Sequence, residues 1–140
     1  MHSNHFADPS VSLMASVAII PWLRGSFQGL LIGVRHQDRL HRLASYTGAK
    51  VQELRIDDEH VWLTVRGRDV TLRIKATRPD GAFLHAPIRT QMHKRVEETL
   101  DSRIEVQLLD AGGRVLLDDV GTSAGLEVHG DTDRLIRMGR

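Results

Sequence analysis

The sequence predicts a mainly β, antiparallel domain with one α-helix, and three observations lead to this prediction. Apolar and polar residues alternate at every second position, most clearly within Asp69–Ala76, as in a strand that is wet on one side. Short turns separate the strand-like segments of Gln28–Ala76, so five consecutive strands should pair as an antiparallel meander. No alternation of strands with helices is visible, which favours an antiparallel sandwich or barrel over a parallel sheet.

Strand segments account for most of the chain. Met1–Pro9 is polar and is expected to form a loop or a frayed strand. Val11–Ile20 is apolar on both faces, which indicates that packed elements or an enclosed cavity cover each face. Pro21 should end this strand because proline has no ladder donor, and Pro21–Phe27 should be a connection. The later strands are expected at Gln28–His36, Asp38–Tyr46, Val51–Asp57, Glu59–Arg66, Asp69–Ala76, Ala82–Ala86, Arg103–Leu109, Arg114–Asp118 and Ala124–His129.

One segment, Pro87–Leu100, has the spacing of a helix. Pro87 suits the first helical turn, where a missing backbone donor costs nothing. The apolar residues recur at every fourth position: Ile88, Met92, Val96 and Leu100. This narrow stripe predicts a helix that lies against the outside or the mouth of a β-layer.

Composition limits the possible functions. A chain of 140 residues, 41% of them hydrophobic, is expected to fold as a single domain, 1–140, with a real core. The 19 basic and 18 acidic residues give a net charge of +1, so no basic field predicts nucleic-acid binding. The chain has no cysteine, which excludes disulfides, thiolate chemistry and zinc–thiolate sites.

Neither a membrane span nor a secretory signal is expected. No apolar run approaches the roughly 20 residues that a membrane-spanning helix needs. The segment Met1–His5 lacks the basic start and apolar centre of a secretory signal. We therefore expect a cytoplasmic protein.

Glu127 is the candidate catalytic acid. In the last expected strand, Leu126 and Val128 share one face, and Gly125, Glu127 and His129 share the other. If the second face meets solvent, Glu127 is an ordinary solvated carboxylate. If it faces a barrel interior, burial raises the pKa of its carboxyl and makes it a usable proton donor.

Four other side chains are candidates for ligand contacts, each with a structural alternative. Trp22 and Phe27 either plug the end of the sandwich or barrel, or form the lip of an apolar ligand pocket. Asn4 belongs either to a terminal loop with local hydrogen bonds or to a strand where it holds a ligand oxygen. Tyr46, the only tyrosine, either donates its hydroxyl to a ligand or anchors a strand end.

No metal site is expected. The eight histidines are scattered along the chain, and none forms a closely spaced pair with a carboxylate nearby. Motifs for phosphate binding, for a nucleophile elbow and for calcium binding are not found in the sequence either.

Six short motifs, in order and roughly in spacing, resemble the tocopherol cyclase family across nearly the whole chain. They are Ser3–Phe6, Pro21–Leu23, Leu31–His36, Tyr46–Ala49, Leu84–Pro87 and Ala124–Gly130. The resemblance implies a lipocalin-like β-barrel, related in architecture to carotenoid hydratases. It also implies an enzyme that closes the chromanol ring of a prenylated quinol by proton-initiated cyclisation without a cofactor.

The resemblance also suggests roles for the candidate residues. It implies that Glu127 delivers the proton, that Asn4 and Tyr46 make polar contacts, and that Trp22 and Phe27 form walls for the prenyl chain. A water-poor barrel suits this reaction because water would trap the cationic intermediate. The alternatives are a non-catalytic lipocalin-like module that binds an apolar isoprenoid or lipid, and an inactive truncated remnant.

The sequence departs from the family before Ser3. The family's larger first part, with a Trp-rich strand, has no counterpart here, so the chain resembles the C-terminal portion of a tocopherol cyclase-like protein. We therefore expect a barrel or part-barrel, with a homodimer through an open sheet edge as one possible outcome.

Overall fold

The computed structural model describes residues 1–77, 84–85, 95–128 and 131–138, and the side chains of all of these except 84–85, 95–100 and 127–128. Within these ranges the chain forms strands, one short 3₁₀ turn and one short helix. The strands are β1 (His2–Ser3), β2 (His5–Phe6), β3 (Ser12–Trp22), β4 (Gly25–His36), β5 (Arg39–Ala44), β6 (Lys50–Ile56), β7 (His60–Arg66), β8 (Val70–Thr77), β9 (Leu84–His85), β10 (Arg95–Asp110) and β11 (Val115–Val128). The turn is η1 (Ser45–Thr47), and the helix is α1 (Thr132–Met138).

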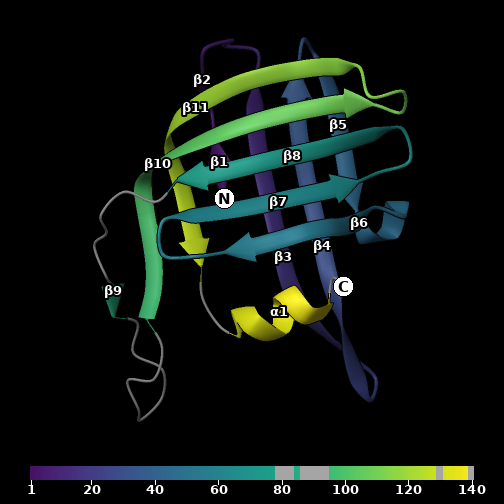
Figure 1. Ribbon diagram of the computed structural model, residues 1–140, viewed down its shortest axis with the longest axis vertical. Coiled ribbons are helices and arrows are strands. Elements are labelled where there is room, and N and C mark those ends of the chain that lie inside the picture. The colour runs from purple at the N-terminus through teal and green to yellow at the C-terminus, as the bar shows by residue number, and fades with distance from the viewer. Residues whose placement is uncertain (78–83, 86–94, 129–130, 139–140) are drawn as a thin grey trace.

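The strands form one antiparallel, nearly closed sheet, which confirms the predicted mainly β, barrel-like class. Their order is β5-β4-β3-β1-β11-β10-β8-β7-β6, with β2 paired to β11 and β9 paired to β10. Figure 1 shows β3, β4 and β5 as a rear layer, with β6, β7, β8 and much of β10 and β11 running across them in front. The two layers are joined where β11 pairs with β1.

Irregular pairing lets the two longest strands bend between the layers. The register of β10 and β11 shifts between Thr99 and Ser102 and again between Ser102 and Ile104. Opposite this point, Ser123 of β11 has a φ of 49°. Because bulges bend a strand and increase its twist, this region lets β10 and β11 leave the front layer and run down its side (Figure 1).

The core lies between the layers and is apolar. Ile32 and Leu43 from the rear layer and Leu72, Ile104 and Leu108 from the front layer are each no more than 1% exposed. Strand alternation places these residues on the inner faces, as the period-2 pattern predicted. At this level the interior is a packed core and not an open channel.

The predicted meander is broken at one point. The five expected strands correspond to β4–β8, but β5 does not pair with β6 among the described residues. Instead η1 and Gly48, whose φ is 81°, redirect the chain from the rear layer to the front layer. β5 and β6 are consequently the two edges of the sheet, and the prediction that every neighbour pairs was wrong here.

Pro21 does not end its strand, contrary to the prediction. β3 continues to Trp22, with Pro21 opposite Ser26 and a two-residue turn, Leu23 and Arg24, leading into β4. The other edge of β3 has no described partner at this level, since β1 pairs only with Leu13 and Met14. A missing backbone donor is tolerated at such a free edge.

The predicted helix at Pro87–Leu100 is wrong in its second half. Residues Arg95–Leu100 belong to β10, where Glu97–Thr99 pair with Leu126–Val128 of β11. Residues 87–94 lie outside the described ranges. A helix forms instead at α1, after the last expected strand. There the Asp131 carboxylate accepts a hydrogen bond from the backbone N–H of Arg134 and caps the first turn.

Candidate ligand site at the open end of the barrel

A pocket of about 590 Å³ lies between the two layers at the end where α1 crosses the barrel. Its lining is mostly apolar and comes from distant parts of the chain. It includes Val17 and Ile19 of β3, Leu54 and Ile56 of β6, Leu63 of β7 and Leu126 of β11. Leu135 of α1 completes the lining at this end of the barrel.

The pocket continues the inner face of β3 beyond the packed core. Leu13 and Ala15 are buried, whereas Val17 and Ile19, next on the same face, are only half-buried. They are half-buried because no side chain among the described residues fills the space beside them at this end. The same inner face of β3 therefore contributes to the core through Leu13 and Ala15 and to the pocket wall through Val17 and Ile19.

A β-bulge in β6 orients the side chains that form the front wall of the pocket. The pairing of β6 with β7 shifts between Val51 and Glu53, so Gln52 and Glu53 are both exposed. Beyond the bulge, Leu54 and Ile56 face inward and pack against the core. An uninterrupted alternation from Val51 would instead have turned Leu54 and Ile56 outward.

Two polar contacts hold α1 over the opening. Gln28 Nε2 donates to the carbonyl oxygen of Leu135 at 2.9 Å, and Arg134 Nη2 donates to Ser26 Oγ at 2.6 Å. Ser26 and Gln28 lie on the inner side of β4, where that strand passes α1 (Figure 1). The helix is therefore attached to the rear layer and covers the pocket from one side.

Charged and metal-binding groups are scarce among the described residues around this pocket. Its polar lining comes from His2, Ser16, Asp131 and Thr132. The Asp131 carboxylate is engaged in capping α1. Among the described side chains, no three histidine, aspartate or glutamate residues lie close enough together to hold a metal ion.

The structure places Glu127 in β11, paired with Glu98 of β10. Its predecessor Leu126 is buried and lines the pocket. The side chain of Glu127 lies outside the described part of the chain, so its role as an acid stays a prediction.

The four other candidates are exposed and do not converge. Trp22 (66% exposed) and Phe27 (41% exposed) lie together on the outer face of the β3–β4 hairpin, where Phe27 is opposite Ile20. Asn4 is exposed beside a shallow pocket on the outside of the rear layer, and Tyr46 is exposed in η1. None of the four lines the pocket beneath α1. As ligand contacts they stay predictions.

Sequence reasoning missed the residues that do line the pocket. Val17 and Ile19 were recognised only as part of a two-sided apolar strand, and Leu54 and Ile56 only as strand residues. The signal for α1 was present, since Asp131 precedes a segment with Leu135 and a basic last turn.

By its fold, the chain is an antiparallel, barrel-like protein, and a mostly apolar pocket lies at the end where α1 crosses the barrel. No family model, curated protein or solved structure matches it. The resemblance to the tocopherol cyclase family therefore depends on the six short motifs alone. No helix among the described residues is both long and apolar enough to cross a membrane.

Proposed function

We propose that this protein binds an elongated apolar molecule, an isoprenoid or another lipid, in the pocket beneath α1. The observation that carries the proposal is the half-buried apolar wall of Val17, Ile19, Leu54 and Ile56 around a volume of about 590 Å³. Ligand pockets of small molecules have volumes of about 300–1,000 Å³ and mostly apolar linings. Covering such a wall contributes roughly 25 cal/mol per Å² of apolar surface removed from water.

The scarcity of charged groups among the described lining residues favours one chemical class of ligand. An ionised ligand would lose its hydration inside the pocket and would need a charged partner there. His2 and Asp131 are the only titratable residues among the described lining. We therefore expect a neutral chain or ring system, with any polar end directed towards the opening.

Ring closure of a prenylated quinol is the catalytic form of this proposal. In that reaction an acid protonates the alkene, the phenol oxygen bonds to the resulting cationic carbon, and the phenol proton is released. Support comes from the position of Leu126 in the pocket wall, because Glu127 follows it directly in β11. The proposed acid is Glu127, as the family resemblance implies.

Titration with Nile red and with retinol, two neutral fluorescent apolar probes, tests the binding proposal. A Val17→Trp variant fills the pocket and should weaken probe binding at least about tenfold, which corresponds to about 1.4 kcal/mol. Val115→Trp is the matched control, because Val115 is 48% exposed at the start of β11 and away from the pocket. Equal affinities for the two variants would contradict the site.

Incubation with a prenylated quinol tests the catalytic form separately. Wild-type protein should produce chromanol, detected by chromatography and mass spectrometry, and Glu127→Gln should abolish its formation. If wild type binds the probes but forms no chromanol, the protein is a binding module. If Glu127→Gln forms chromanol as fast as wild type, Glu127 is not the acid.

A further inference from the structure

The β3–β4 hairpin exposes an unusual group of large apolar side chains. Leu23 is 93% exposed, Trp22 66%, Phe27 41% and Ile20 37%. Ile20 and Phe27 are opposite each other, and Trp22 follows on the same outer face, so the group is continuous. Figure 1 shows this hairpin extending past α1, away from the body of the barrel. Contiguous exposed apolar patches mark interaction sites.

Leu23 itself indicates that the tip is not an ordinary turn. It has a φ of 48°, in the left-handed region that glycine, asparagine and aspartate occupy at low cost. The turn between β4 and β5 also has positive φ values, but Gln37 and Asp38 occupy that turn. A leucine at such a position is strained and exposed at once, which is a combination found at functional sites.

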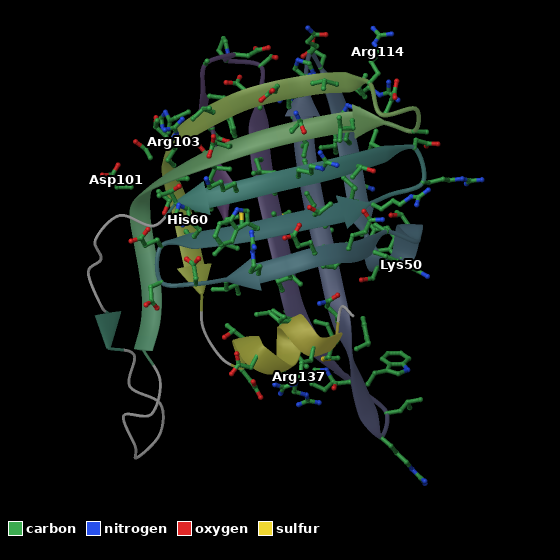
Figure 2. All side chains as sticks on the ribbon, in the orientation of Figure 1. Lys50, His60, Asp101, Arg103, Arg114 and Arg137 are labelled. Carbon is green, nitrogen blue, oxygen red and sulfur yellow. The ribbon has the colours of Figure 1, made fainter. Side chains whose placement is uncertain are left out.

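Basic residues lie in the apolar tip and beside it. Arg24 is exposed within the turn, and Arg134 and Arg137 are exposed on α1 beside it. Figure 2 places Arg137 below α1, at the same end of the molecule as the hairpin. The acidic residues Asp131 and Asp133 belong to the first turn of α1, the end farther from the hairpin (Figure 1).

We propose that the tip of the β3–β4 hairpin and the last turn of α1 dock on an anionic membrane surface. Tryptophan, leucine and phenylalanine insert at the level of lipid headgroups, and arginines beside them bind acidic headgroups. The pocket beneath α1 lies at this same end of the barrel, since Thr132 and Leu135 of α1 line it. Docking would bring the pocket to the bilayer, where it could exchange its apolar ligand. This exchange rests on the proposed function, whereas docking itself depends only on the hairpin and α1.

Vesicle flotation tests the docking surface. The protein should float with vesicles of phosphatidylcholine that contain phosphatidylserine, and much less with pure phosphatidylcholine. Leu23→Ser should lower the partition coefficient about tenfold, because it removes an inserted apolar side chain. Arg24→Gln should lower it about fivefold, since a basic residue near an anionic surface contributes about 1 kcal/mol.

Matched controls lie at the other end of the molecule. Leu40→Ser replaces a leucine that is 56% exposed on β5, and Arg114→Gln replaces an arginine at the β10–β11 turn, which Figure 2 shows far from α1. Both variants should partition as wild type does.

Fluorescence gives a second readout that does not depend on vesicle flotation. The chain has two tryptophans, and Trp62 lies on the front layer against His60 and Arg55. Brominated lipids should therefore quench wild-type emission through Trp22, and Trp22→Phe should remove most of that quenching.

Three results would overturn the proposal. They are an absence of partitioning onto anionic vesicles, partitioning that Leu23→Ser leaves unchanged, and a solution dimer that Leu23→Ser converts to monomer without any vesicle binding. The last result would assign the tip to a second copy of this chain. Val17→Trp, which should lose probe binding yet still float, separates a failure of docking from a failure of the ligand site.

Discussion

Gln28 of β4 and Leu135 of α1 are joined by a hydrogen bond of 2.9 Å from the Gln28 amide to the Leu135 carbonyl oxygen. With the bond from Arg134 to Ser26, it keeps a seven-residue helix in place over the pocket. A helix this short does not persist in water without tertiary contacts. Whether the pocket is covered therefore depends on the polar inner residues of β4.

Gln28→Ala should loosen α1. The loss of a net hydrogen bond of about 1 kcal/mol should raise amide hydrogen exchange in α1 about fivefold, with little change in β7 and β8. Gln107→Ala, which truncates a half-buried glutamine on β10, is the control and should leave α1 unchanged. Equal exchange in both variants would show that α1 is held by other contacts.

Two glycines of β11 should respond differently to alanine. A Cβ at Gly121 would lie 2.9 Å from the ring of Phe6 and 3.1 Å from Ser3 Oγ, both of which are buried. The three atoms nearest to a Cβ at Gly125 would all belong to the imidazole of His2, an exposed side chain that can turn away. We expect Gly121→Ala to cost about 1–3 kcal/mol of unfolding free energy and Gly125→Ala below about 0.5 kcal/mol, as measured by urea denaturation. The reverse order would contradict the packing of Phe6.

His41 should make stability depend on pH near neutrality. Partial burial, with smaller contributions from the charges of Arg39 and His36, lowers the pKa of His41. Because the unfolded chain then binds the proton more tightly, stability should fall as pH falls below about 6.5. In urea denaturation between about pH 8 and pH 5, His41→Gln should flatten this slope. His5→Gln, which removes an exposed histidine, should preserve it, and identical profiles for the two variants would contradict the assignment.

Asp119 should anchor the N-terminal segment. Its carboxylate accepts backbone hydrogen bonds from Ala7, Asp8 and Val120 at 3.2, 2.9 and 2.7 Å. Asp119→Ala leaves the part-buried donors of Asp8 and Val120 unmatched and should cost about 1–3 kcal/mol in urea denaturation. Asp118→Ala, which removes an exposed carboxylate next to it, is the control and should change stability by less than about 0.5 kcal/mol.

Local patterns predicted the class of fold because they act over short distances. The alternation in Asp69–Ala76 corresponds to β8, and the short turn at Gln37 and Asp38 forms the β4–β5 hairpin with φ values of 50° and 61°. The same reasoning failed for Arg95–Leu100, where spacing by four suggested a helix. Pairing with β11 across the sheet overrides that local preference.

The site was harder to predict because it depends on register and on contacts between distant segments. Alternation alone cannot place Leu54 and Ile56 in a pocket wall, since the bulge at Gln52 and Glu53 decides which way they face. The aromatic residues of the β3–β4 hairpin were noticed, but their exposure follows from the extension of β3 through Pro21.

The joining of the two layers through β1 and β11 has a consequence for the growing chain. Gly125, the partner of His2, is synthesised more than a hundred residues after it. At a synthesis rate of about 5–20 residues per second, the edge of β3 that β1 later links to β11 is uncovered for several seconds. During that interval the nascent chain exposes a sheet edge with unpaired backbone N–H and C=O groups. A chaperone that binds extended segments would shield this edge.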